Sequence, residues 1–117
     1  MAGNRLERIK EEVKRELSGI IRRLKDPRIA DVVSVVAVDI TKDLKYAKAR
    51  ISVMGTDDQK KDTITALNSA AGFIRREISA NLDLRNTPEF KFVPDNSVEY
   101  GIHIDELIHK INKNERD

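Results

Sequence analysis

A strict alternation of apolar and polar residues between Lys45 and Met54 constrains the fold of this chain more than any other feature. In this stretch, KYAKARISVM, the residues expected on one face are Ala47, Ala49, Ile51 and Val53, and those on the other are Tyr46, Lys48, Arg50 and Ser52. The preceding run VVSVVAVDI, from Val32 to Ile40, is rich in β-branched residues, and only TKDL separates the two runs. The sequence therefore predicts an antiparallel hairpin with one buried face.

Helical periodicity flanks this hairpin on both sides. Before it, apolar residues recur at steps of three and four from about residue 4 to residue 24, and Asp26-Pro27 ends the pattern because proline cannot continue a helix. After it, Thr56 and Gln59 have the spacing of a capping box, and helical periodicity runs to about residue 82. The apolar positions expected to be buried are Leu6, Ile9, Val13, Leu17, Ile20 and Leu24 in the first helix, and Ile64, Leu67, Ala71, Ile74, Ile78 and Leu82 in the second.

A third strand and a last helix complete the pattern. The stretch PEFKFV, from Pro88 to Val93, predicts a short strand with Phe90 and Phe92 on one side. Because a helix separates it from the hairpin, this strand is reached by a crossover, and the sheet should be mixed. A last helix is expected at about 97–112, followed by a frayed tail. The prediction is a single α+β domain over residues 1–117, with helices on one face of a three-stranded mixed sheet.

Composition excludes several classes of protein. The chain has no cysteine, so disulfides and thiol chemistry are excluded, and no apolar run reaches the length of a membrane span. We therefore expect a soluble cytoplasmic protein. The net charge of +2 is small, but residues 1–28 carry nine Lys and Arg against five Asp and Glu, and residues 95–117 carry three against six. This polarity predicts one electropositive surface, or simply two ordinary solvated helix surfaces.

Motifs for catalysis or for bound cofactors are missing. The sequence has no GxGxxG, no phosphate-binding GKS or GKT loop and no GxSxG elbow. The two histidines, His103 and His109, lie in the expected last helix, where Asp105 and His109 are four residues apart and could share a metal. No third ligand stands at a fixed spacing, so no metal site is expected. We predict a protein that is not an enzyme and that uses no cofactor.

Basic side chains are the stronger functional signal. They occur after the first helix, along the hairpin and in the second half of the long helix, and together they could form a surface that binds RNA phosphates. The candidates are Arg22, Arg23, Lys25, Arg28, Lys45, Lys48, Arg50, Arg75 and Arg76. The alternative is that they only solvate helix ends, where cations are favoured in any case. Aromatic residues make up 4% of the chain, so recognition should depend on shape and phosphates more than on base stacking.

Gly72 is unusual because it lies inside the long helix, just before Arg75 and Arg76. A glycine in a helix interior costs about 1 kcal/mol relative to alanine, so it needs a reason. We predict a kink at Ala70 and Gly72 that re-aims the two arginines and lets the backbone approach a partner. The alternative is close packing of the helix against the sheet.

The order and spacing of several segments resemble the ribosome-binding factor A family over nearly the whole chain. These segments are RLERIKEEVKREL, DPRI at 26–29, DLKYAKARISV at 43–53, AAGFIRREI at 70–78 and TPEFKFVPDNSVEYGIHIDELI at 87–108. The resemblance implies a type II KH-like fold in which an AxG kink, matched by Ala70, Ala71 and Gly72, replaces the GxxG loop. Ser69 stands where the first glycine of a GxxG loop would be.

The resemblance also implies a function. It implies a non-enzymatic, monomeric factor that binds free or immature 30S ribosomal subunits, contacts 16S rRNA, assists late maturation and 5′-end processing of that RNA, and supports growth in the cold. Functional links with assembly GTPases are implied as well. Two other hypotheses stay open: a generic KH-like module for single-stranded RNA, and a protein-interaction adaptor that uses the acidic last helix.

Overall fold

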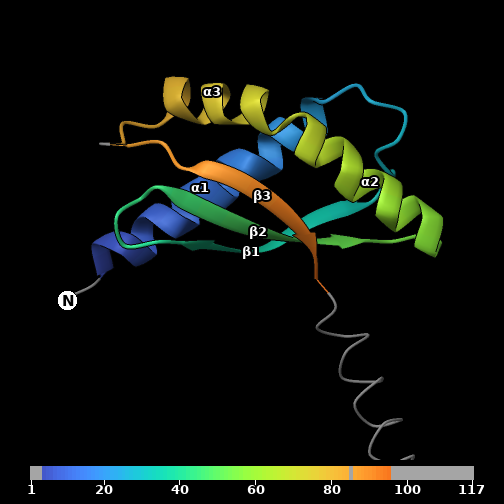
Figure 1. Ribbon diagram of the computed structural model, residues 1–117, viewed down its shortest axis with the longest axis horizontal. Helices are drawn as coiled ribbons and strands as arrows, with labels where there is room; N and C mark the ends of the chain where they lie inside the picture. The colour runs from blue at the N-terminus through green and yellow to red at the C-terminus, as the bar shows by residue number, and fades with distance from the viewer. Residues whose placement is uncertain (1–3, 85, 96–117) are drawn as a thin grey trace, which may run out of the picture.

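The computed structural model describes residues 4–84 and 86–95, which form three helices and three strands (Figure 1). In chain order these are α1 (Asn4–Arg23), β1 (Val33–Ile40), β2 (Tyr46–Val53), α2 (Asp57–Ser69), α3 (Ala71–Asn81) and β3 (Glu89–Pro94). The predicted α+β class and order of elements are confirmed. The expected last helix, the tail and both histidines lie outside the described residues.

The sheet has the order β1-β2-β3 and is mixed, as the crossover argument predicted. β1 and β2 are antiparallel, whereas β2 and β3 are parallel. The register shifts between Val35 and Ala37, which is a bulge that the sequence analysis did not predict. Because the bulge adds a residue, Val35 and Val38 are both buried although they are three positions apart.

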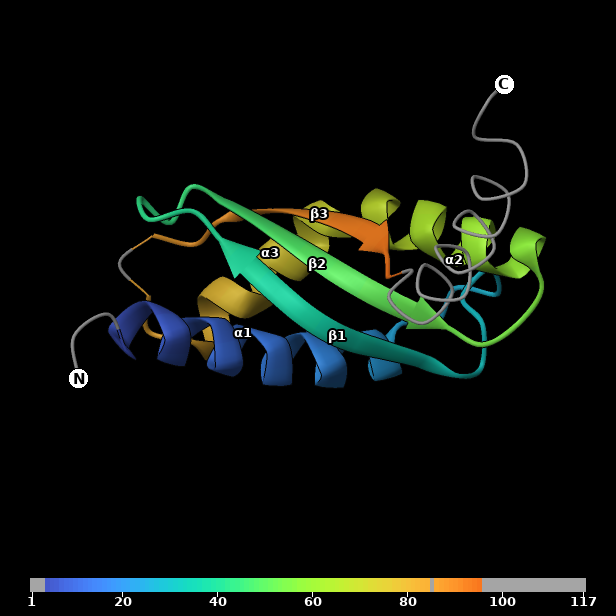
Figure 2. The same cartoon turned by 90° about the horizontal axis from the view of Figure 1, so that it is seen from below.

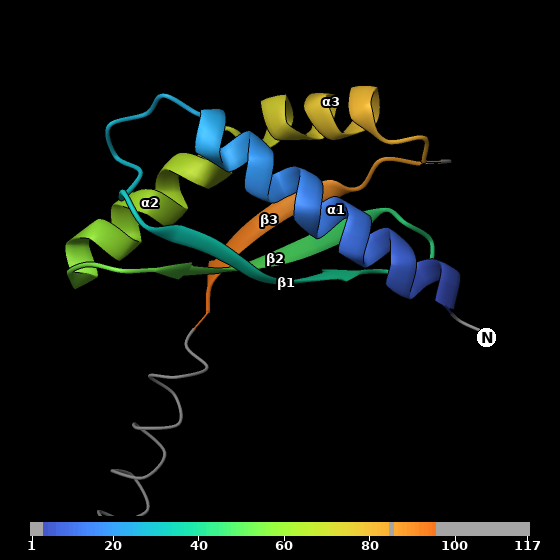
Figure 3. The same cartoon turned by 180° about the vertical axis from the view of Figure 1, so that it is seen from behind.

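In the part of the chain that the structure describes, the three helices cover one face of the sheet and leave the other face, the open face, uncovered (Figures 2 and 3). The alternation in β2 is as predicted, since Ala47, Ala49, Ile51 and Val53 are buried in the core. Phe90 and Phe92 join this core from β3, with ring centroids 6.3 Å apart. The core thus lies between the helix layer and the sheet, and the polar residues of β2 lie on the open face.

The long second helix is broken at Ala70. The capping box at its start is present, with Thr56 and Gln59 bonded reciprocally, and α2 ends at Ser69. Ala70 has φ −91° and ψ 4°, and α3 begins at the next residue. The predicted kink is therefore confirmed, and Gly72 lies just beyond it in the first turn of α3.

Close packing of the helix against the sheet does not explain Gly72, so that alternative is wrong. The residue is exposed, and a Cβ added to it would meet only the Nη1 atom of Arg76, at 3.9 Å. The glycine therefore leaves open space on the outer surface of α3. Nothing within the described part of the chain requires that space.

None of the helices in the described residues is long and apolar enough to span a membrane. Within the same residues there is also no cluster of three or more His, Cys, Asp and Glu side chains suited to a metal ion.

Candidate nucleic-acid interface

The end of α1 presents exposed cations. Arg22 and Arg23 occupy its last turn and Lys25 follows directly, and all three are exposed. The guanidinium of Arg23 lies over Gly19, four residues earlier. A Cβ placed on Gly19 would be 3.3 Å from the Nη1 atom of Arg23. Cations at this position are favoured by the carboxyl end of the helix dipole.

The start of α3 has a similar arrangement. The guanidinium of Arg76 lies back over Gly72, four residues earlier, and both residues are exposed. Phe73, next to Gly72, leaves 44% of its surface exposed and so offers an apolar ring at the surface of α3. Phe73 was not predicted from the sequence, because a single phenylalanine in a helix is ordinarily part of the core.

α1 and α3 hold these residues in one layer. The helices pack against each other, and the side-chain amide of Asn81 donates to the Glu16 carboxylate at 2.9 Å. α3 crosses the direction of α1 obliquely, and the end of α1 and the start of α3 both lie toward α2 (Figures 2 and 3). Arg23 lies seven residues after Glu16 and so on the same side of α1, the side that faces α3. We call Arg22, Arg23, Lys25, Phe73 and Arg76 the helix patch.

Arg28, by contrast, is engaged within its own loop. Its Nε and Nη2 atoms donate to the two carboxylate oxygens of Asp26 at 3.1 and 2.8 Å, and its backbone N–H donates to the same carboxylate at 2.9 Å. These bonds, above all those from the guanidinium, lower the pKa of Asp26 below its usual value. Arg28 therefore stabilises the loop between α1 and β1.

Arg50 and Arg75 are engaged as well. Arg50 lies 3.6 Å from the Asp95 carboxylate and 3.9 Å from that of Asp39. Arg75 donates from Nε to the Thr87 carbonyl at 3.1 Å, and its Nη1 atom lies 4.0 Å from Glu89. Both arginines tie parts of the sheet to their neighbours, which leaves less of their charge for an external anion.

The lysines of the hairpin lie apart from the helix patch. Lys45 is exposed just before β2, and Lys48 points from β2 to the open face of the sheet. Lys91 of β3 is the Cα partner of Lys48 and shares that face, although the sequence analysis did not name it. Its position between the buried Phe90 and Phe92 was the signal that could have revealed it.

The predicted cations therefore do not converge on one surface. Arg22, Arg23, Lys25 and Arg76 lie in the helix layer, whereas Lys48 and Arg50 lie on the opposite, open face of the sheet. The side chains of β2 alternate between the two faces of the sheet, so its polar residues all point to one face. The helices cover the other face, and the cations of β2 and those of the helices therefore lie on opposite sides of the sheet.

Comparisons with known proteins all point to one protein family. The family model for Ribosome-binding factor A matches residues 5–108. The Ribosome-binding factor A of Clostridium kluyveri is 53% identical over 117 residues, which cover 99% of this chain and 97% of that protein.

Solved structures show the same fold. The crystal structure of ribosome-binding factor A from Thermus thermophilus aligns with a TM-score of 0.69 at 22% identity, covering 76% of this chain and 94% of that one. A homology model of Thermus thermophilus ribosome binding factor A, fitted into a cryo-EM map of a 30S complex, aligns with a TM-score of 0.63 at 23% identity, covering 74% and 91%. The chain belongs to the ribosome-binding factor A family.

Proposed function

We propose that this protein is a non-enzymatic assembly factor that binds immature 30S ribosomal subunits through RNA phosphates, with the helix patch as its principal contact. Family membership supports this proposal, as does the 30S complex of the Thermus thermophilus relative. The proposal includes contact with 16S rRNA, assistance in the late maturation and 5′-end processing of that RNA, and a role in growth in the cold. It places the protein in the cytoplasm as a monomer, functionally linked to assembly GTPases.

The observation that carries the proposal is a difference between engaged and free cations. Arg28, Arg50 and Arg75 each lie within 4.0 Å of a carboxylate. The cations of the helix patch are Arg22, Arg23, Lys25 and Arg76. In the described part of the chain, no carboxylate lies within 4.0 Å of any of them. Free exposed cations of this kind can bind RNA phosphates without first breaking an internal ion pair.

Phe73 and Gly72 add a surface that can approach RNA closely. The exposed ring gives an apolar contact beside the Arg76 guanidinium, and the open space over Gly72 lets a sugar or phosphate come near the helix backbone. Such contacts recognise the shape of a folded RNA segment and not its base sequence.

The mechanism follows from differential affinity. A binding protein can shift an equilibrium between two RNA conformations only by the difference between its affinities for them. We therefore expect tighter binding to immature subunits than to mature ones, so that binding stabilises an intermediate until maturation removes the preferred surface.

Co-sedimentation with small subunits tests the proposal. Reversing the charges of the helix patch, with Arg22→Glu, Arg23→Glu and Arg76→Glu together, should abolish co-sedimentation without changing the thermal unfolding of the domain. A triple reversal at the exposed Arg5, Lys42 and Lys61 is matched in charge and should retain most of the binding. Equal loss in both variants would show that only net charge matters and would overturn the assignment to the helix patch.

Salt dependence and competition separate the rival functions. About four phosphate contacts should give a slope of about −3 in log affinity against log salt. A flat response would favour the protein-interaction adaptor, whereas preference for a short unstructured RNA over subunits would favour the generic KH-like module.

A further inference from the structure

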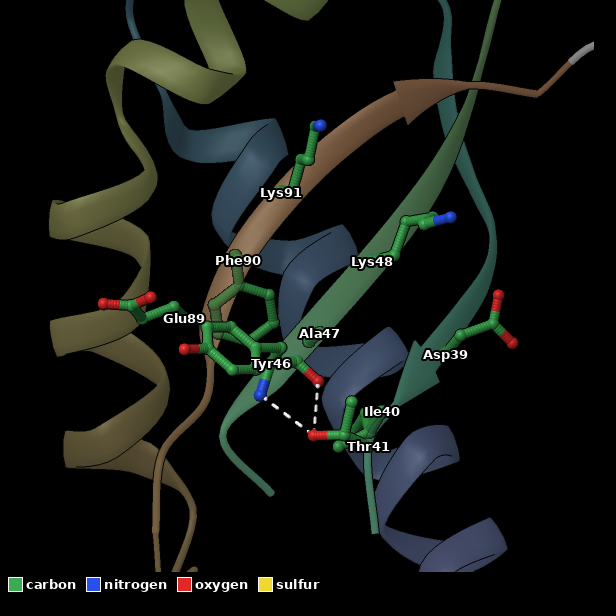
Figure 4. Close-up of a pocket in the computed structure, with 9 residues that line it drawn as sticks. All are labelled: Asp39, Ile40, Thr41, Tyr46, Ala47, Lys48, Glu89, Phe90 and Lys91. Atoms are coloured by element: carbon green, nitrogen blue, oxygen red, sulfur yellow. Dashed lines mark hydrogen bonds between the residues drawn. The ribbon is translucent and has the colours of Figure 1, made fainter. Parts of the chain in front are cut away.

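The open face of the sheet carries a shallow hollow of about 510 Å³ beside the ring of Tyr46 (Figure 4). Tyr46 leaves 57% of its surface exposed, whereas Phe90 and Phe92 on the neighbouring strand are buried on the other face. Lys48 and Lys91 also line the hollow, and Figure 4 shows both on the same side of the Tyr46 ring, Lys48 on β2 and Lys91 on β3. The hollow thus combines one accessible aromatic ring with cations on two adjacent strands.

The two carboxylates that border the hollow are already matched by arginines. Glu89 lies 4.0 Å from Arg75, which reaches it from α3, and Asp39 lies 3.9 Å from Arg50. Figure 4 shows the Glu89 side chain directed toward the helices and away from the lysines. The engaged arginines therefore reduce the repulsion that these carboxylates would exert on a bound anion.

The two lysines that line the hollow are not paired with a carboxylate of any described residue. Lys48 and Lys91 are Cα partners across β2 and β3, and neither lies within 4.0 Å of a carboxylate in the described part of the chain. Neighbouring lysines repel each other, so an anion between them relieves an unfavourable contact. The charge of the hollow is complementary to a phosphate.

The turn before β2 fixes the backbone of Tyr46. Thr41 donates its N–H to the Tyr46 carbonyl at 2.9 Å, and its hydroxyl accepts the Tyr46 N–H at 3.1 Å. The Asp43 carboxylate accepts from the Thr41 hydroxyl at 2.7 Å and from the backbone N–H of Lys45 at 3.0 Å, and these bonds lower its pKa. The ring is therefore presented by a rigid backbone, which reduces the entropy lost on binding.

We infer that this hollow, the sheet-face site, binds an unpaired stretch of RNA, with one base stacked on Tyr46 and a neighbouring phosphate held by Lys48 and Lys91. Aromatic rings with nearby cations are the usual platform for single-stranded RNA, and stacking accepts any base. One ring allows one stacked base, which agrees with the low aromatic content. The inference rests on the proposed function and extends it, because the sheet-face site and the helix patch lie on opposite layers and would let one molecule hold two RNA segments.

Tyrosine fluorescence tests the stacking directly. The chain has two tyrosines and no tryptophan, so in the full-length Tyr100→Phe variant Tyr46 is the sole tyrosine. A hexamer of uridylate titrated into this variant should quench its fluorescence in a saturable way. An unchanged signal at millimolar hexamer would overturn the inference.

Matched variants identify the contacts. Tyr46→Thr removes the ring but keeps a residue that favours strands, and it should weaken hexamer binding about 5- to 150-fold, whereas Tyr46→Phe should change it by less than about twofold. Lys48→Gln with Lys91→Gln should weaken binding and reduce the salt slope by about 1, while Lys61→Gln on α2 should not. Equal affinity for wild-type protein and Tyr46→Thr would overturn the stacking role.

The two proposals fail in different ways. Charge reversal of the helix patch should abolish co-sedimentation with subunits and leave the quenching of Tyr46 by the hexamer intact. Quenching that is lost together with the helix patch would show that the sheet-face site does not exist as a separate contact. Loss of co-sedimentation in the helix-patch variant with quenching retained supports both proposals.

Discussion

The side-chain amide of Asn68 binds both backbone groups of Phe92. Its Nδ2 atom donates to the Phe92 carbonyl at 3.0 Å, and its Oδ1 atom accepts the Phe92 N–H at 2.8 Å. β3 has β2 on one side only, so these groups would otherwise lie unpaired at the edge of the sheet. Asn68, at the end of α2, thus takes the place of a residue in a fourth strand, and Pro94, which has no N–H, ends the same edge.

Replacing Asn68 should destabilise the domain through this edge. Asn68→Ala removes both bonds and should lower the free energy of unfolding by about 1 kcal/mol, since the better helix propensity of alanine offsets part of the loss. Urea unfolding measures the change, and hydrogen exchange at the Phe92 amide should become faster. Ser69→Ala, at the exposed neighbouring position, is the control and should leave that amide protected.

A second prediction concerns Thr63, a buried polar residue of the core. Its hydroxyl accepts the N–H of Ala30 at 2.9 Å and lies 3.3 Å from the Arg28 carbonyl, to which it donates. Thr63→Val keeps the shape of the side chain but leaves the partly buried N–H of Ala30 without a partner, so the free energy of unfolding should fall by about 1–3 kcal/mol. Thr65→Val, at an exposed position of the same helix, should cost much less. Similar losses of stability in Thr63→Val and Thr65→Val would show that the loss comes from placing valine in the helix and not from the missing hydrogen bond.

The sequence predicted regular elements well because their periodicity is set by many residues at once. The alternation in β2 and the three-four spacing in α1 each repeat over several turns or pleats, so no single exception disturbs them. The bulge between Val35 and Ala37 was not predictable, because a run of β-branched residues looks the same in either register. Thr63 was missed because a threonine on a helix is ordinarily exposed, and only the loop at Ala30 gives its hydroxyl a partner.

The candidate site was harder to predict than the fold. Whether a cation is free or engaged depends on contacts such as Arg75 with Thr87, which join residues that lie apart in the chain. The sequence also assigned Lys48 and Arg76 to one potential surface, although the sheet separates them. Lys91 was within reach of the sequence, since alternation in β3 places it on the face opposite Phe90.

The Asp26 and Arg28 pair predicts a pH dependence. The Arg28 guanidinium holds the pKa of Asp26 below its ordinary value of 3.8, so this carboxyl contributes stability above that value and loses it as the pH falls through the lowered pKa. In Arg28→Gln, the pKa of Asp26 should rise toward 3.8, and stability should depend less on pH in the acid range. NMR titration of the Asp26 carboxyl carbon measures the shift. A pKa that stays unchanged in the variant would assign the effect to the backbone N–H of Arg28 alone.

Gly72 gives the sharpest test of the helix patch, because stability and binding should change in opposite directions. A Cβ at this position meets only the Arg76 side chain, at 3.9 Å, so Gly72→Ala should raise the free energy of unfolding by about 0.5–1 kcal/mol. The added methyl group fills the space that we assign to RNA, so co-sedimentation with small subunits should weaken, and Gly72→Val should weaken it further. Ser79→Ala, at an exposed position farther along α3, also improves helix propensity and should leave binding unchanged. A Gly72→Val variant that binds subunits like the wild type would show that no RNA approaches the backbone there, and the helix patch would then reduce to its cations and Phe73.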